Sequence, residues 1–129
     1  MKNHTFRRKT DDALIVLPCY FNKDEFAIAL DTGASHTTID LNVLYMEGYS
    51  IQDALGTSQF EGATNVFDAY IFKVKKFTCL GITKYDMQIA AYDFLAHHLL
   101  ADFDGVLGLD FFNEHKFCVD FRQNLITFE

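Results

Sequence analysis

Short apolar runs separated by turn-forming residues set the pattern of this chain. The run at 13–21 (ALIVLPCYF) and the run at 26–30 (FAIAL) flank residues 22–25 (NKDE), whose side chains favour a turn. Two apolar runs joined by a short polar turn predict a β-hairpin. Pro18 has no backbone N–H, so it predicts an edge position or a bend in the first strand.

The second half of the chain shows similar strand-like periodicity. In the segment 69–77 (AYIFKVKKF), residues alternate between an apolar face that includes Phe72 and Val74 and a face that carries lysines. The segment 85–93 (YDMQIAAYD) is a further strand candidate. The segment 116–129 (KFCVDFRQNLITFE) predicts two strands around a tight turn.

Helical signals are few and short. Asp40 is suited to cap a helix over 41–46, and Gly48 is suited to end it. A second short helix is expected over 110–115, and a helical turn or two within 93–103. Mostly short strands with two or three short helices predict an all-β domain with a closed, barrel-like sheet.

Length and composition fit one globular domain. The chain has 129 residues, of which 50% are hydrophobic, and it contains no repeat or linker-like segment. Residues 1–12 are polar, so we expect a flexible N-terminal arm followed by a single domain over 13–129.

The charge of the chain argues against two classes of partner. A net charge of −7 argues against nucleic-acid binding, since only the short basic run Arg7-Arg8-Lys9 departs from the acidic balance. No apolar run has the length of a signal peptide core or a membrane span. We therefore expect a soluble, cytoplasmic protein with no membrane contact.

The cysteines and histidines show no ligand pattern. The three cysteines, at positions 19, 79 and 118, lack metal-like or redox-like spacing and predict buried, reduced thiols. The adjacent residues His97 and His98 point in diverging directions on a helix and to opposite faces on a strand, so they make a poor metal pair. We expect no metal and no cofactor. His36 lies close to the motif described next and is either a loop residue or part of its rim.

The apolar strand at 26–30 ends directly on Asp31, Thr32 and Gly33. A carboxylate at the edge of an apolar wall needs hydrogen-bond donors to stabilise its charge. Gly33 permits a tight turn and a close backbone approach, and the Thr32 hydroxyl can bond to another backbone segment. An ordinary strand followed by an Asp-Gly-type turn would explain the same letters, so the triplet alone leaves both interpretations open.

Two motifs together resemble those of the retropepsin-like aspartic proteases. The first is Asp31-Thr32-Gly33-Ala34-Ser35, and the second is Val106-Leu107-Gly108, just before the second expected helix. In that family a strand ends in Asp-Thr-Gly-Ala/Ser, a flap hairpin follows, and a late apolar-apolar-Gly unit opens a helix. The order matches over about residues 13–128. The resemblance implies a retropepsin-type barrel that hydrolyses peptide bonds in peptides or unfolded proteins.

The resemblance also implies a role for each matching residue. Asp31 would be catalytic, residues 32–35 would support the active-site loop, and residues 106–108 would pack behind it. Thr32 would brace two such loops across a dimer axis. The flap would lie within 51–67, with four candidate residues: Gly56, Thr57, Gly62 and Ala63. Its tip is left open between the two glycines.

A single Asp-Thr-Gly triplet implies a dimer. Asp104 and Asp110 are the nearest rival carboxylates, and neither is followed by Thr-Gly. Activation of a water by carboxylates alone takes two of them, which share one proton. One triplet per chain therefore implies a homodimer with two copies of Asp31 at its two-fold axis.

Some features depart from the family pattern and leave alternatives. Viral members typically carry an arginine after the late glycine, paired with an acidic residue four positions after the catalytic aspartate. Leu109 and Ser35 occupy these positions here. The alternative is thus a catalytically weak or inactive dimerisation or peptide-binding module. DTGAS also fits the phosphate loop of actin-like ATPases, but 129 residues leave no room for their two lobes.

Overall fold

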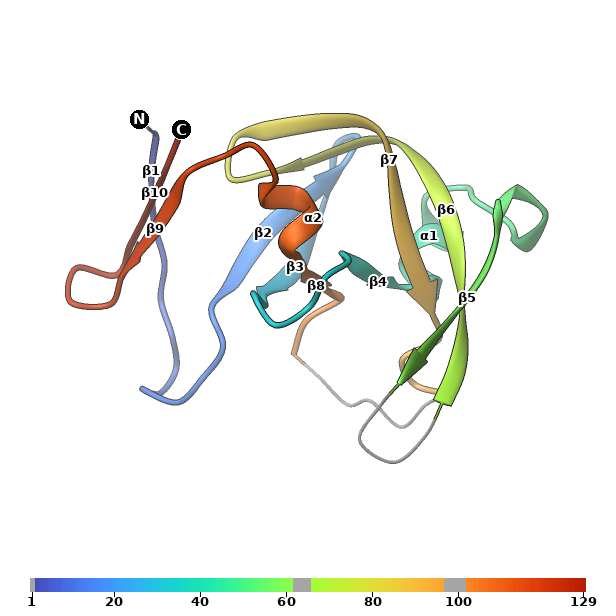
Figure 1. Ribbon diagram of the computed structural model, residues 1–129, viewed down its shortest axis with the longest axis horizontal. Helices are drawn as coiled ribbons and strands as arrows, with labels where there is room; N and C mark the ends of the chain where they lie inside the picture. Colours follow the sequence, from blue (N-terminus) through green and yellow to red (C-terminus); the bar gives the residue numbers. More distant parts are fainter. Residues whose placement is uncertain (1, 62–65, 97–101) are drawn as a thin grey trace.

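A computed structural model describes residues 2–61, 66–96 and 102–129, and it is dominated by β-strands (Figure 1). Its strands and helices, in chain order, are β1 (Lys2–Thr5), β2 (Val16–Phe21), β3 (Asp24–Leu30), β4 (Thr38–Asp40), α1 (Leu41–Met46), the 3₁₀ turn η1 (Ile51–Asp53), β5 (Gly56–Glu61), β6 (Val66–Cys79), β7 (Ile82–Tyr92), β8 (Gly105–Leu107), α2 (Leu109–Phe112), β9 (Phe117–Asp120) and β10 (Leu125–Phe128). None of the described helices is long and apolar enough to cross a membrane.

The main sheet closes on itself. Its strand order is β2-β3-β8-β4-β7-β6-β5, and β2 also pairs with β6. This extra pairing makes a closed barrel of six strands and leaves β5 outside it, where β6 is its one partner among the described strands. The expectation of an all-β fold with a barrel-like sheet and a few short helices is confirmed.

The first hairpin forms as the apolar pattern predicts. Strands β2 and β3 pair antiparallel, and Asn22 in the turn between them adopts a left-handed φ of 56°. Pro18 pairs with Ala27 on β3, whereas the ladder between β2 and β6 begins only at Cys19. The missing N–H of Pro18 therefore lies just outside the second ladder, which accommodates the proline at an edge.

The core fills the barrel with aromatic and aliphatic side chains. On β6, Phe72 and Val74 are buried whereas Lys73 and Lys75 are exposed, as the alternation predicts. The ring of Phe77 contacts both Phe21 on β2 and Phe111 on α2. These contacts join the wall of the barrel to the short helix that follows β8.

The two helices differ in how well the sequence predicts them. For α1, the Asp40 side chain accepts the N–H of Asn42, and Gly48 beyond the helix has a φ of 92°, as expected. The second helix was expected over 110–115, but α2 ends at Phe112. Asn113 leaves the helical conformation, with φ −54° and ψ 136°, and the ring of Phe112 stacks on Phe117 at the start of β9.

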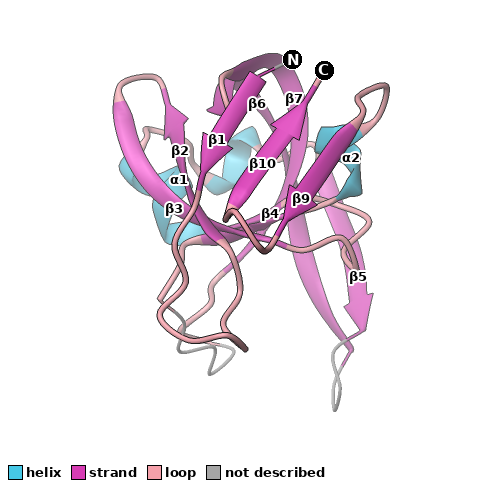
Figure 2. Ribbon diagram, turned by 90° about the vertical axis from the view of Figure 1, so that its left-hand side faces the viewer, coloured by secondary structure: helices cyan, strands magenta, loops and turns pink. Residues whose placement is uncertain are grey.

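The N-terminal residues differ from the expected flexible arm. Strand β1 pairs antiparallel with β10, which also pairs with β9, and Phe6 beyond it is buried. Figures 1 and 2 show this three-stranded sheet at one side of the barrel, with the two chain ends side by side. The two terminal strands of one chain thus pair with each other.

The segment 93–103 lies partly outside the described residues. Residues 94–96 form a turn, and His97 and His98 belong to the part that is not described.

The cysteines are free, and two of them face each other. Cys19 on β2 and Cys79 on β6 are buried register partners, and burial raises the pKa of both thiols, that of Cys79 to about 12. Cys118 is exposed on β9, so the expectation of a buried thiol is wrong there. The alternation of the short strand β9 turns this side chain outward.

Candidate active site

Asp31 lies where a buried strand leaves the barrel. Ile28, Ala29 and Leu30 at the end of β3 are buried, and β3 pairs in parallel with β8. The backbone N–H of Asp31 donates to the carbonyl of Leu107 on β8 at 3.1 Å. The ladder thus continues one residue past the strand and fixes the backbone from which the carboxylate projects.

The carboxylate of Asp31 is held by its own turn. Its Oδ1 accepts the backbone N–H of Gly33 at 2.9 Å, and the N–H of Ala34 donates to the Asp31 carbonyl at 3.1 Å. A Cβ atom at position 33 would lie 3.1 Å from this Oδ1, so a larger residue there would have to push the carboxylate oxygen by a few tenths of an ångström. Among the described residues no donor reaches the second carboxylate oxygen, which leaves it available to a ligand.

The rest of the first motif faces outward. Thr32, Gly33 and Ser35 are exposed, and Ala34 is partly buried. The structure therefore brings residues 31–35 together as one loop. The role of Thr32 across a dimer axis stays a prediction.

The second motif lies directly behind this loop. Strand β8 runs between β3 and β4, so that Val106 has Ala29 on one side and Thr38 on the other. Gly108 follows, and a Cβ atom there would lie 2.6 Å from the carbonyl carbon of His36 and 2.9 Å from the Ala34 oxygen. No larger residue fits between the helix start and the loop.

The two rival carboxylates are already bonded to backbone groups. Asp104 accepts the N–H of Ala27 at 2.9 Å. Asp110 accepts the backbone N–H of Thr37 at 2.9 and 3.0 Å and its hydroxyl at 2.7 Å. Both carboxylate oxygens of Asp110 are thus engaged, whereas Asp104, like Asp31, accepts a backbone N–H with one oxygen. The sequence marks both residues as acids but carries no local signal of these bonds, because their partners lie 77 and 73 positions away along the chain.

Strands β5 and β6 form an antiparallel hairpin within the segment where a flap was expected, and this hairpin extends away from the barrel (Figure 1). Gly56 pairs with Ile71, and the described ladder ends at Glu61 and Val66. The flap candidates Gly56 and Thr57 therefore lie at the base of the hairpin, and Gly62 and Ala63 lie outside the described residues.

A hollow of about 320 Å³ lies beside the loop. Its lining includes Thr32 and the apolar side chains of Leu14, Leu30 and Phe121. Leu14 and Phe121 are 53% and 57% exposed, although the guanidinium of Arg8 lies 4.8 Å from the Phe121 ring centre. The exposed loop is thus flanked by uncovered apolar surface.

The described residues offer no group of three His, Cys, Asp or Glu side chains that could hold a metal ion. His36 is exposed at the edge of the loop, where its backbone contacts Gly108. The chemistry that the arrangement supports on its own residues is acid–base chemistry at a carboxylate.

Comparison with known proteins supports the family resemblance that the two motifs indicate. A family model described as aspartyl protease matches residues 17–111, which include both motifs. The fold is similar to the crystal structure of a retropepsin-like aspartic protease from Rickettsia conorii, with a TM-score of 0.71 and 17% sequence identity. The match covers 96% of this chain and 87% of the other. No curated protein matches the sequence significantly. The chain belongs to the aspartyl protease family and has its retropepsin-like fold.

Proposed function

We propose that this protein is a homodimeric aspartic endopeptidase whose two symmetry-related Asp31 carboxylates activate one water. The observation that carries the proposal is the geometry of Asp31, which combines a fixed backbone, one oxygen held by Gly33 and one oxygen that no donor of the described residues reaches. A flap hairpin and a matching family model support it.

The reaction follows from a pair of carboxylates that shares one proton. Two carboxylates about 3 Å apart do not both ionise readily, so one stays protonated over a range of pH. The ionised partner takes a proton from the water, whose oxygen attacks the peptide carbonyl carbon, while the protonated partner donates its proton to the carbonyl oxygen. When the C–N bond breaks, the leaving nitrogen takes a proton from the pair.

The surface around the hollow supports a second copy of this chain as the partner. A two-fold interface must be complementary to itself. The apolar part of the hollow, which includes Leu14 and Phe121, has both a cation, Arg8, and an anion, Asp12, at its edge. Because β1 and β10 already pair within the chain, the dimer that we propose is centred on the active-site loop rather than on exchanged terminal strands.

The activity is tested with an unfolded protein or a peptide library between pH 4 and 7. We expect cleavage that pepstatin-class inhibitors block and that Asp31→Asn abolishes. Peptide binding without turnover, unchanged by Asp31→Asn, would instead favour a peptide-binding module.

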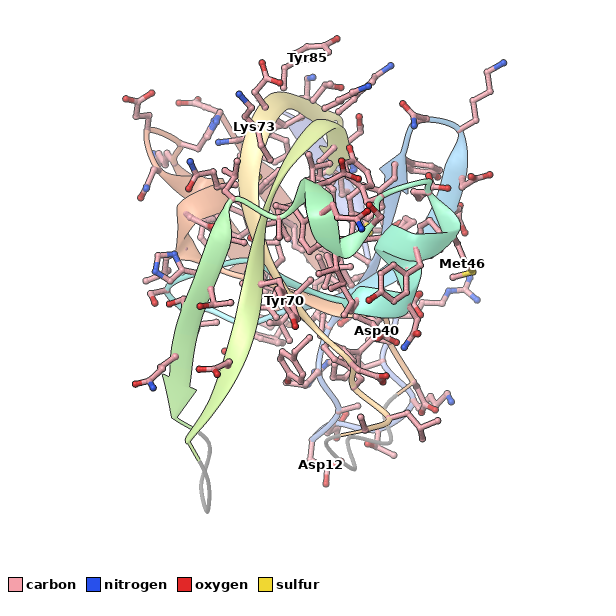
Figure 3. All side chains as sticks on the ribbon, turned by 90° about the vertical axis from the view of Figure 1, so that its right-hand side faces the viewer. Asp12, Asp40, Met46, Tyr70, Lys73 and Tyr85 are labelled. Atoms are coloured by element: carbon pink, nitrogen blue, oxygen red, sulfur yellow. The ribbon has the colours of Figure 1, made fainter. Side chains whose placement is uncertain are left out.

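The partner is tested by sedimentation equilibrium. Leu14→Ser should weaken the dimer at least about tenfold, whereas Tyr85→Ser, which changes a side chain 68% exposed, should not. Tyr85 is a matched control because it lies at the opposite end of the molecule from Asp12 (Figure 3). A strictly monomeric wild-type protein at high concentration would contradict the dimer.

A further inference from the structure

We propose that Asp110 is a positioning residue that holds the active-site loop in place through Thr37 and Gly108. The inference rests on the proposed function for its kinetic readout. Its structural readout does not depend on that function.

Three hydrogen bonds connect Thr37, at the end of the active-site loop, to Gly108 and Asp110. The N–H of Gly108 donates to the Thr37 hydroxyl at 3.1 Å, and this hydroxyl donates to Oδ1 of Asp110 at 2.7 Å. The backbone N–H of Thr37 also donates to the Asp110 carboxylate, at 2.9 Å to Oδ1. A single side chain therefore fixes both the backbone and the side chain of the residue that ends the loop.

Two backbone bonds strengthen the same connection. The N–H of Leu109 donates to the Ala34 carbonyl at 2.8 Å, and the N–H of Asp110 donates to the Ser35 carbonyl at 3.3 Å. The first turn of α2 thus bonds to the loop through two backbone N–H groups and through the Asp110 carboxylate, which accepts both the N–H and the hydroxyl of Thr37. The position of residues 31–37 depends on where α2 begins.

Because these groups are buried, the loss of one hydrogen bond in this connection would be costly. Thr37 is completely buried and Gly108 is buried, so water cannot replace a lost partner of the Gly108 N–H or of the Thr37 hydroxyl. A hydrogen bond with an ionised acceptor is also stronger than a neutral one. Position 109 carries leucine and position 35 serine, so an ion pair between them is impossible, and Asp110 provides a charged contact within the same two segments.

The connection has a consequence for catalysis. Asp31 and Thr37 are the two ends of the same loop, and Asp31 is anchored to Leu107, the residue before Gly108. Loss of the Asp110 carboxylate would remove the side-chain bonds that hold this end of the loop, leave its backbone bonds in place and allow the reacting carboxylate to shift. A displacement of about 1 Å in a catalytic group can lower the rate about 100-fold.

The experiment compares Asp110→Ala with Asp110→Asn in the full chain. An asparagine oxygen in the place of Oδ1 can accept both Thr37 donors, so it should rescue the loop in part. We expect kcat to fall about 100-fold for the alanine variant and less than about tenfold for the asparagine variant, with KM changed by less than about threefold. The position of the acidic and basic limbs of the pH–rate profile should also move in the alanine variant.

Asp104→Ala is the matched control. Asp104 is also a partly buried aspartate that accepts a backbone N–H, but its partner is Ala27 on β3 and not the loop. It should lower the melting temperature by an amount similar to Asp110→Ala and leave kcat within about threefold of wild type. A similar fall of kcat in both variants would show a merely structural role and would overturn the proposal.

Amide hydrogen exchange gives a readout without substrate. Exchange of the Gly108 amide should accelerate at least about tenfold in Asp110→Ala and stay near wild type in Asp104→Ala. Unchanged exchange at Gly108 overturns the positioning role, whether or not the protein cleaves peptides. If Asp110→Ala does not fold, Thr37→Val and Thr37→Ser replace it, because serine keeps the hydroxyl that valine removes. Equal Gly108 exchange in these two variants would likewise overturn the proposal.

Discussion

The active-site loop and the flap hairpin differ in how many neighbours hold them. The loop bonds to β8 and α2 from behind, and Thr37 at its end is completely buried. Strand β5 of the flap pairs only with β6, and its described side chains, those of residues 56–59, are exposed. The contrast is between a part of the molecule fixed by several contacts and a part fixed by one ladder.

This difference fits what each region must do. A carboxylate that transfers protons needs a fixed position, because small displacements are costly for the rate. A hairpin that covers an extended peptide needs to open, and such elements come from the less stable parts of a fold. Under the proposed function, the same barrel would support a rigid site at the end of one strand and a loosely attached cover at another.

The largest difference between the loop and the flap is expected when a glycine in each region is replaced by alanine and the free energy of unfolding is compared. At Gly108 a Cβ atom would lie 2.6 Å from the backbone of His36, whereas at Gly56 nothing lies within 4 Å. We expect Gly108→Ala to lower the free energy of unfolding by about 3 kcal/mol and to abolish cleavage. Gly56→Ala should change it by less than about 0.5 kcal/mol. Urea unfolding measures both, and equal stabilities would contradict the packing at the loop.

Amide hydrogen exchange should show the next largest difference. The amides of Asp31 and Leu109 donate to Leu107 and Ala34 behind the loop. We expect them to exchange at least about 100-fold more slowly than the amides of β5, because opening the loop requires the core to open. Equal protection of the β5 amides from exchange would mean that the flap is held as firmly as the loop, which would contradict the difference between the two regions.

The sequence predicts those parts of the fold that depend on neighbouring residues. The first hairpin follows from two apolar runs and a turn, the buried face of β6 from alternation, and the start of α1 from the capping side chain of Asp40. Each signal lies within a few residues of the element that it specifies. The Asp-Thr-Gly triplet is equally local, because Gly33 bonds to Asp31 two positions away.

What the sequence does not reveal depends on distant partners. Strand β1 is polar (KNHT) and is paired by β10 at the other end of the chain, so no local apolar pattern marks it. Asp110 and Thr37 are 73 positions apart, and only the fold brings them together. The end of α2 coincides with the stacking of Phe112 on Phe117, a contact between two elements that helix propensity does not describe.

A smaller effect, on the pH dependence of stability, is expected from Glu47 near the base of the flap. Glu47, beside Tyr49, Leu55 and Lys73, has its pKa raised to about 7 by burial and by the carboxyl of Asp24. Below about pH 4.5 Glu47 is protonated in both the folded and the unfolded chain. As the pH rises towards 7, ionisation favours the unfolded chain, so stability is lost and then levels off above 7.

The measurement is urea unfolding from pH 4 to pH 8. The free energy of unfolding lost through ionisation of Glu47 should be about 1 kcal/mol, since solvent screens the interaction between the partly exposed carboxyls of Glu47 and Asp24. Glu47→Gln should remove this loss, and Glu114→Gln, at an exposed position on a turn, should not. A pH dependence that survives Glu47→Gln would place its origin elsewhere in the molecule.

The smallest effect on stability is expected at Thr57, in the flap itself. Its register partner is Tyr70 on β6, and its side chain is exposed. Thr57→Ala should leave the free energy of unfolding within about 0.5 kcal/mol of wild type. If the flap acts by covering substrate, the variant should raise KM a few-fold at constant kcat, because it weakens ground-state and transition-state binding equally. A fall in kcat at constant KM would instead show that the base of the hairpin positions the reacting groups as the loop does. The flap would then position the reacting groups together with the loop, although the flap is held by a single ladder.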